Sequence, residues 1–528
     1  MRPCGVFLKT RSMNRFAFLF TAIAISFSAT FAQAELKLPS IFGHHMVLQR
    51  DMENPIWGWA EPNAGVSINF AGKAIAAKAD ADGRWKAKLP SLPGSSHAMN
   101  LTITSGSDKV TLSNIVMGEV WICSGQSNMQ WSVDQSYDPD LEKATANYPN
   151  IRLISVPQVG TQEEQDDFDG QWDICTPATV GQFSGVGYFF GRQLHQTLGV
   201  PIGLIDNAWG GSAAEAWVER GVLEKDGRFD DYIAQWVETE KTFDYEKAMA
   251  EWRTKAEAAK AAGKNPPRAP RNTLAGQHRP GNLWAGVLHP TIGYGIRGTI
   301  WYQGESNAGR AYQYDDLFGL MITEWRKAWG QGDFPFYWVQ LADFRDEVDT
   351  PGENEWAELR EAQTNTLALP KTGQAVIYDI GEGRDIHPRD KQNVGKRLAR
   401  IALAKDYGIP VHYQSPSYKS MEIQGNKAVL TFENVGSTLY AFDTRDAVGF
   451  AVAGEDKTWY NATGKLVGKD KVEVTSPDVE NPVAVRYAWA VNPVANLRSR
   501  EGLPVVPFRT DDWPQITDPA TAPEPATQ

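Results

Sequence analysis

Between residues 118 and 410 the sequence repeats one pattern: an apolar, β-prone run, a polar turn, and a segment with apolar residues at helical spacing. Strands that alternate with helices in this way predict a parallel sheet with helices on both faces. In such sheets, ligands bind beyond the carboxyl ends of the strands. The pattern therefore predicts an α/β fold and indicates where in that fold the chemistry should lie.

The elements of this pattern can be assigned by residue range. We expect strands in residues 115–122, 201–208, 296–302, 334–341 and 375–379, and helices in residues 184–198, 314–329, 356–369 and 390–407. Residues 220–280 are charged and rich in alanine, which favours a mostly helical insertion. A plain solvated insertion is the alternative.

Four of the predicted strands are followed by small or polar residues: Ser127, Gly210-Gly211, Gln303-Gly-Glu305 and Asp385-Ile-His387. The carboxyl ends of parallel strands lie at one edge of a sheet, so these clusters can converge on one site.

Ser127 is the candidate nucleophile. It lies in the turn Ser124-Gly-Gln-Ser-Asn-Met129, directly after the apolar run, where Gly125 leaves room for a substrate. A serine that only serves the turn is the alternative. The turn is not the Gly-x-Ser-x-Gly elbow of α/β-hydrolases, because Met129 stands where the second glycine would be.

A serine nucleophile needs a base, a carboxylate that orients the base, and donors for the developing oxyanion. His387 is the candidate base, because it follows a predicted strand among glycine and acidic residues. Asp385 is the nearest carboxylate able to orient it, and Glu305 is a second candidate. A structural histidine is the alternative.

The candidate oxyanion hole consists of backbone N–H groups of Gly210 and Gly211 and the side-chain amide of Gln303. The glycine pair also fits a simple tight turn between a strand and a helix.

Outside the central pattern, short alternating runs predict β structure. We expect a β-sandwich-like N-terminal domain (residues 35–114), a central domain (115–410), a C-terminal β domain (411–516) and a disordered tail (517–528) that is rich in Pro, Ala and Thr.

Residues 1–34 have the basic start, apolar run and small-residue end of a cleaved secretory signal, which predicts a secreted or periplasmic protein without a membrane anchor. The net charge is −12, and loss of the four positive charges of this segment would leave −16. Such acidity argues against nucleic acid and anionic lipid as partners. Oligomeric state is left open.

Two cysteines remain after the predicted cleavage. Cys123 and Cys175 can either pair in an oxidising compartment or stay as two buried thiols. No Cys/His cluster has metal-ligand spacing, so we expect neither a metal nor another cofactor.

Four ordered motifs resemble the sialate O-acetylesterase family of SGNH-type carbohydrate esterases. They are GEVWICSGQSNMQW (residues 118–131), GLIDNAWGGS (203–212), IWYQGESN (300–307) and DIHPRDK (385–391). The resemblance implies a flavodoxin-like, three-layer core and metal-free hydrolysis of acetyl esters on sugars, such as sialic acid or plant polysaccharide, through an acetyl-serine intermediate.

Matched by position, the resemblance implies Ser127 as nucleophile, His387 as base, Gly210 or Gly211 as oxyanion glycine, and Gln303 in place of the usual oxyanion asparagine. SGNH enzymes usually place the acid three residues before the histidine, where this chain has Arg384. The choice between Asp385, Glu305 and no acid therefore stays open. A non-catalytic glycan-binding protein with a vestigial esterase core is the alternative function.

Overall fold

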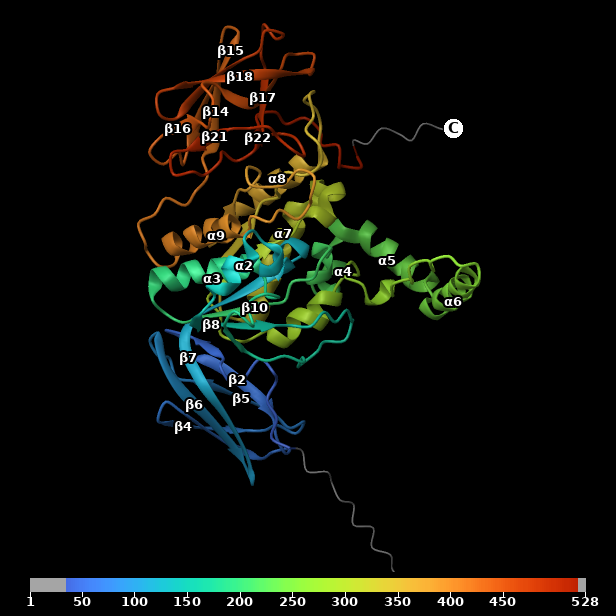
Figure 1. Cartoon of the computed structure of the whole chain (residues 1–528), viewed down its shortest axis with the longest axis vertical. Coiled ribbons are helices and arrows are strands. Elements are labelled where there is room, and N and C mark those ends of the chain that lie inside the picture. Colours follow the sequence, from blue (N-terminus) through green and yellow to red (C-terminus); the bar gives the residue numbers. More distant parts are fainter. Residues whose placement is uncertain (1–34, 521–528) are drawn as a thin grey trace, which may run out of the picture.

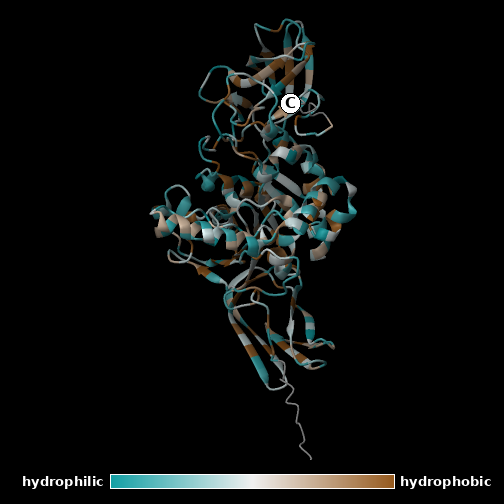
Figure 2. Ribbon diagram, turned by 90° about the vertical axis from the view of Figure 1, so that its right-hand side faces the viewer, coloured by the Kyte–Doolittle hydropathy of each residue, from teal (hydrophilic) through white to brown (hydrophobic). Residues whose placement is uncertain are grey.

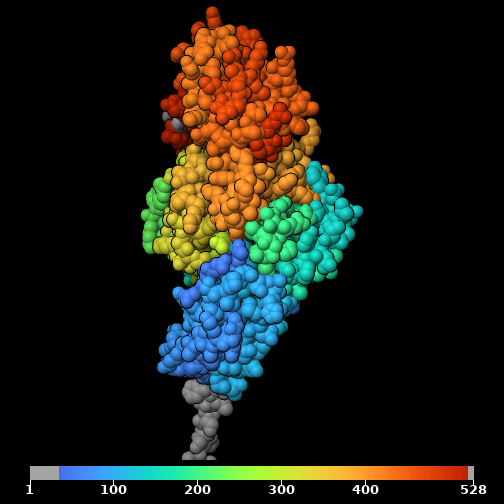
Figure 3. Space-filling view, turned by 90° about the vertical axis from the view of Figure 1, so that its left-hand side faces the viewer, coloured from blue at the N-terminus to red at the C-terminus, as the bar shows by residue number. Residues whose placement is uncertain are grey.

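The computed structural model describes residues 35–520. The molecule is elongated, with β structure at both ends and a mixed α/β region between them (Figure 1). Figure 3 shows the same three tiers stacked along the long axis. The predicted signal (1–34) and most of the predicted tail (521–528) lie outside the described residues.

The middle tier is built on a sheet with the strand order β13-β12-β11-β7-β10-β8-β9. All neighbours are parallel except β9, which runs antiparallel to β8. The strands are β7 (Asp108–Gly125), β8 (Tyr148–Ser155), β9 (Asp173–Cys175), β10 (Ile202–Asp206), β11 (Gly298–Tyr302), β12 (Phe336–Val339) and β13 (Thr372–Ala375). A mixed α/β fold with a parallel sheet is confirmed.

Helices pack on both faces of this sheet. Trp121 of β7 contacts Phe190 of α3, whereas Trp301 of β11 contacts Phe318 of α7. Trp121 pairs with Gly298, so Trp301, three residues further along β11, faces the opposite side. The longer helices of this core are α3 (Gly185–Leu198), α7 (Tyr314–Trp329), α8 (Glu355–Asn365) and α9 (Lys391–Lys405), and the shorter ones are α1 (Ser127–Gln130) and α2 (Pro139–Ala144).

The predicted helix at residues 184–198 shows why such boundaries can be read from sequence. The Ser184 hydroxyl accepts a hydrogen bond from the Gly187 N–H at 3.0 Å and so caps α3 at its start. Gly199 ends the helix in the left-handed conformation, with φ of 67°.

The predicted strand at 375–379 is wrong in position, because β13 ends at Ala375 where that strand should begin. Beyond it, Val376 and Tyr378 pack into the core of the C-terminal tier, whereas Ile377 packs into the core of the middle tier. Successive apolar residues of this segment pack alternately into two separate cores. In the sequence, this pattern is the same as that of a strand buried on both faces.

The N-terminal tier shares its core and one strand with the middle tier. The first half of β7 pairs antiparallel with β6, and the second half pairs parallel with β10 and β11, so the strand passes through residues 114 and 115 without a break. The other strands of this tier are β1 (Val47–Gln49), β2 (Asn54–Trp59), β3 (Gly65–Phe70), β4 (Lys73–Lys78), β5 (Arg84–Leu89) and β6 (Ser95–Ser105).

The C-terminal tier is β-rich and has its own hydrophobic core. Hydrophobic residues lie along the strands of both β tiers in Figure 2. The strands are β14 (Ser417–Gln424), β15 (Lys427–Glu433), β16 (Leu439–Ala441), β17 (Ala447–Ala453), β18 (Trp459–Val467), β19 (Lys471–Thr475), β20 (Ala484–Tyr487), β21 (Leu497–Ser499) and β22 (Phe508–Arg509).

Three helices follow Glu219 and project from the side of the middle tier (Figure 1): α4 (Arg220–Lys225), α5 (Asp230–Thr242) and α6 (Tyr245–Ala261). Cys123 and Cys175 are both buried free thiols. Thr517, in the predicted tail, donates its hydroxyl to Glu358 at 2.6 Å. Within residues 35–520, no helix is long and apolar enough to cross a membrane.

Candidate active site

Ser127 and His387 meet beyond the carboxyl edge of the sheet, although 260 positions separate them in the sequence. The His387 Nε2 atom lies 2.9 Å from the Ser127 hydroxyl oxygen. A hydroxyl that donates to an unprotonated ring nitrogen at this distance is the arrangement that general-base activation of a serine needs.

The turn before Ser127 depends on Gly125. This residue has φ of 131°, and a Cβ atom there would lie 2.2 Å from the carbonyl oxygen of Tyr302 on β11. The next residue, Gln126, donates its backbone N–H to the same oxygen at 2.9 Å. Close approach of β7 and β11 therefore fixes the point where the chain leaves the sheet and begins α1 with Ser127.

Neighbours of Ser127 hold His387 in place. The Trp131 ring stacks on the imidazole, with ring centroids 4.2 Å apart and planes inclined by 6°. The Asn128 amide donates to the carbonyl oxygen of Ile386 at 2.9 Å, beside the base. The segment that carries the candidate nucleophile thus also positions the candidate base.

The two candidate acids differ in whether they contact His387 directly. Asp385 is 54% exposed, accepts a hydrogen bond from the His387 backbone N–H at 2.9 Å, and has Oδ1 3.6 Å from the ring Nδ1. Glu305 is half-buried, and its Oε1 accepts from the Asn128 amide at 2.7 Å. Asp385 therefore faces the ring directly, whereas Glu305 acts on the asparagine that holds the base.

Lys391, at the start of α9, adds a buried positive charge. Its ammonium group donates to the Asn128 carbonyl oxygen at 2.6 Å, and burial lowers its pKa to about 7. Burial also lowers the pKa of His387, Lys391 lowers it further, and Asp385 opposes both effects. His387 is thus held in the neutral form that a base requires.

The predicted oxyanion residues are placed differently from one another. The Gly210 N–H donates to the side-chain oxygen of Gln130 at 2.8 Å, and a Cβ atom on Gly210 would lie 3.3 Å from the Ser127 Cβ. Gly211 has φ of 71°, and its carbonyl accepts from the Ser306 hydroxyl at 3.0 Å. Of the two glycines, Gly210 therefore offers a backbone donor beside the nucleophile.

Gln303 does not have the predicted geometry. Its side chain is buried and donates to the Ser212 carbonyl at 3.0 Å and to the Asn307 side-chain oxygen at 2.7 Å. An amide nitrogen carries two hydrogens, so none remains for an oxyanion. Gln303 instead supports the segment after Gly211.

A cavity of about 450 Å³, here named the catalytic pocket, opens beside Ser127 and His387. Its wall carries hydroxyl and amide groups and the carboxyl of Asp206, whose pKa burial raises to about 7. No lysine or arginine of the described residues lines it. Within residues 35–520, no group of three or more His, Cys, Asp or Glu side chains could hold a metal ion. The residues that complete the lining are Gln130, Trp131, Ser132, Gln135, Ser155, Val156, Gln158, Gln182 and Ala208.

Asn128, Trp131 and Lys391 were missed as functional candidates, although all three lie inside the motifs that carry the resemblance. Their residue types give no local sign of a role. Each contacts a residue that is distant in the sequence. The sequence indicates their role only by their positions, close after Ser127 or close after His387.

Known proteins that are similar to this chain are acetylesterases. The profile of the family described as "Carbohydrate esterase, sialic acid-specific acetylesterase" matches residues 117–259 and 287–404. The mouse sialate O-acetylesterase is 31% identical over 435 residues, which cover 75% of this chain and 78% of that protein. The human protein of the same name is 28% identical over 499 residues, covering 87% and 88%.

Among solved structures, a carbohydrate acetylesterase from Xanthomonas citri is 38% identical, with a TM-score of 0.76, and the match covers 90% of this chain and all of that one. Together, these matches define the chain as a carboxylic-ester hydrolase. It belongs to the sialate O-acetylesterase family. The alternative of a non-catalytic glycan-binding protein is not favoured.

Proposed function

We propose that the protein hydrolyses acetyl esters on carbohydrates through an acetyl intermediate on Ser127. The observation that carries this proposal is the 2.9 Å contact between the Ser127 hydroxyl and a His387 ring held by Trp131, in a pocket open to substrate. The relatives named for sialate and carbohydrate acetyl esters support the acyl group and the substrate class.

In the first half-reaction, His387 Nε2 takes the Ser127 proton while the serine oxygen attacks the acetyl carbonyl carbon. The tetrahedral intermediate collapses, the bond to the sugar oxygen breaks, and His387 returns its proton to that oxygen. In the second half-reaction, His387 deprotonates a water molecule that attacks the acetyl-serine, and acetate leaves as Ser127 regains its proton.

Two backbone N–H groups fit the oxyanion hole. The N–H of Gly210 reaches it once the Gln130 side chain moves aside. The N–H of Ser127 is the second donor, because the first residues of a helix have no intrahelical acceptor for their N–H groups. Asp385 is the carboxylate that stabilises the imidazolium, since it lies nearest to Nδ1.

The finer fold assignment belongs to the same proposal. A parallel sheet with α3 and α7 on opposite faces, and catalytic residues beyond its carboxyl edge, supports the three-layer, flavodoxin-like SGNH arrangement. Within it, residues 115–410 form the esterase domain, between the two β domains expected from the sequence.

Acetate release from an acetyl ester tests the mechanism. Wild-type enzyme that is rapidly denatured during turnover should carry an acetyl group on Ser127, detectable by mass spectrometry of the peptide. Ser127→Ala should abolish both the adduct and turnover. A variant that keeps wild-type turnover would rule out Ser127 as nucleophile.

Export is proposed from the composition of residues 1–34. Expression of the full chain in a bacterium, followed by fractionation and N-terminal sequencing, should give a periplasmic or secreted protein that begins near Glu35. An uncleaved chain in the cytoplasm would contradict this.

A further inference from the structure

A second cavity, of about 490 Å³, is lined in part by residues that form hydrogen bonds with the Gly210-Gly211 turn. We name it the insertion pocket, because one wall is α5 and another is formed by residues 271–278. None of its lining residues lines the catalytic pocket.

Residues of both pockets form hydrogen bonds with the Gly210-Gly211 turn. On the catalytic side, its Gly210 N–H meets Gln130. On the other side, the Gln277 amide donates to the Gly210 carbonyl at 3.3 Å, and a His278 ring N–H donates to the Gly211 carbonyl at 2.5 Å. Gln277 and His278 therefore connect the lining of the insertion pocket to the turn that carries the Gly210 N–H.

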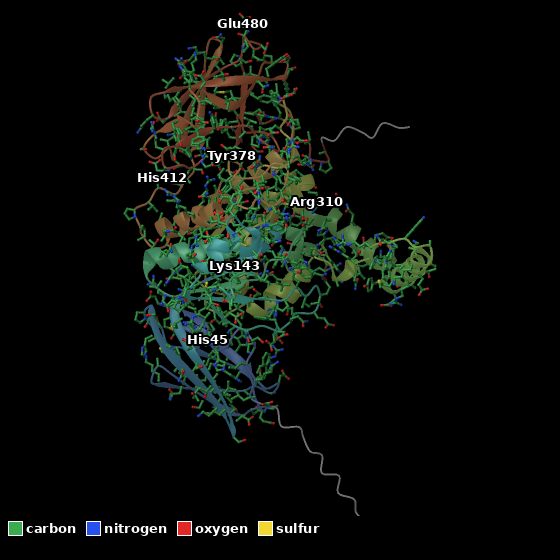
Figure 4. All side chains as sticks on the ribbon, viewed as in Figure 1. His45, Lys143, Arg310, Tyr378, His412 and Glu480 are labelled. Carbon is green, nitrogen blue, oxygen red and sulfur yellow. The ribbon has the colours of Figure 1, made fainter. Side chains whose placement is uncertain are left out.

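The insertion pocket offers positive charge. Arg271 is exposed, and within residues 35–520 it forms no ion pair. Arg310 (labelled in Figure 4) pairs with Glu215 at 2.8 Å and lies over the Tyr232 ring, yet its buried Nε has no hydrogen-bond partner in the part of the chain that the structure describes. Among the described residues, no Asp or Glu lines this pocket, whereas Asp206 lines the catalytic pocket, and no Lys or Arg does.

The wall that carries Arg271 differs from the catalytic residues in its relation to the family profile. Residues 271–278 fall between the two segments, 117–259 and 287–404, that match the family profile. The catalytic residues, by contrast, all lie inside the matched segments. The charge of this wall is therefore a property that the shared chemistry does not require.

We propose that the insertion pocket binds the carboxylate of an acidic sugar in the glycan whose acetyl ester occupies the catalytic pocket. Arginine pairs with carboxylates through two parallel hydrogen bonds, which suits a planar anionic group. The amides of Gln235, Asn272 and Gln277 can bind neighbouring hydroxyl groups. This inference rests on the proposed esterase function and adds the charge of the substrate to it.

Two acidic esters test the idea, each compared with a neutral twin whose carboxylates are methyl-esterified. The esters are an O-acetylated oligogalacturonide and an O-acetylated sialic acid, and the quantity measured is kcat/KM for acetate release. Wild-type enzyme should prefer the free acid of at least one pair by about tenfold, and added salt should reduce the preference.

Arg271→Ala should remove that preference, mainly by raising KM for the free acid, and should leave hydrolysis of 4-nitrophenyl acetate unchanged. Arg271→Lys should keep part of the preference. The matched control is Arg253→Ala, because Arg253 is an exposed arginine on α6 that lines neither pocket.

The proposal would be overturned if wild-type enzyme showed no preference for the free acid in either pair. It would also be overturned if Arg271→Ala lowered kcat/KM equally for the free acid and for its methyl-esterified twin. These results differ from failure of the esterase proposal itself, which would show as turnover of 4-nitrophenyl acetate by Ser127→Ala.

Discussion

The catalytic pocket and the insertion pocket are similar in size but are built in different ways. Catalytic groups leave the ends of buried strands, and close backbone contacts such as that between Gly125 and Tyr302 fix their positions. Most insertion-pocket groups lie on α5 and on residues 271–278, and the charge is carried by the long side chains of the exposed Arg271 and the half-buried Arg310. We therefore expect substitutions in the catalytic pocket to change kcat, and substitutions in the insertion pocket to change KM for particular substrates.

The largest effect is expected at the reacting pair. Ser127→Ala and His387→Ala should each lower kcat for a simple acetyl ester by about 10³-fold or more, and by similar factors because the two residues act as a unit. Titration calorimetry with a non-acetylated oligogalacturonide should show unchanged binding. Weaker binding of this oligogalacturonide in these variants would mean that the two pockets do not act independently.

The two carboxylates should differ from each other. Asp385→Asn should lower kcat by about tenfold, because the imidazolium loses its nearest negative charge. Glu305→Gln should cost only a few-fold, since the glutamine carbonyl can still accept from Asn128. Steady-state kinetics of both variants on 4-nitrophenyl acetate would decide, and equal, negligible losses would indicate a Ser–His dyad.

The pH dependence of kcat/KM should depend on the charge of Lys391. kcat/KM should follow the neutral form of His387 and fall as the pH drops through a pKa below 6.5. Because Lys391 has a pKa of about 7, it is charged over this acid limb. In Lys391→Met the pKa of His387 should therefore rise, and the limb should move to higher pH. An unmoved limb would mean that Lys391 does not influence the base.

The smallest effect is expected at Gln130, whose side-chain oxygen accepts from the Gly210 N–H. A substrate must displace this oxygen to use the donor, so Gln130→Ala should raise kcat/KM for 4-nitrophenyl acetate about two- to threefold. Gln182→Ala, which changes another glutamine of the same pocket, is the control and should have no effect. A loss of activity in Gln130→Ala would instead mean that Gln130 positions the glycine turn.

Sequence predicted the parts of the site that depend on strand ends. Ser127 and His387 each follow a change from apolar to polar residues, and a parallel sheet brings such positions together. Gln303 was predicted as a donor because of its residue type, but Ser212 and Asn307, which use its hydrogens, reach it only through the fold.

The insertion pocket could not be predicted from the sequence, because its walls come together only through the fold. Its walls come from residues 232–239 and 271–278, neither of which has a motif, and tertiary packing alone brings them beside Ser306. The composition of residues 220–280 indicated helices, which form up to Ala261, but composition does not specify where a helix docks.

The unbroken course of β7 has a consequence for how such a protein can change by recombination. Exchange of the first 114 residues for an unrelated module would cut inside a strand of 18 residues, whose far end leads directly to the nucleophile. The N-terminal tier and the serine are therefore inherited as one unit. Arg271 of the insertion pocket, in an exposed segment away from this strand, can be replaced separately.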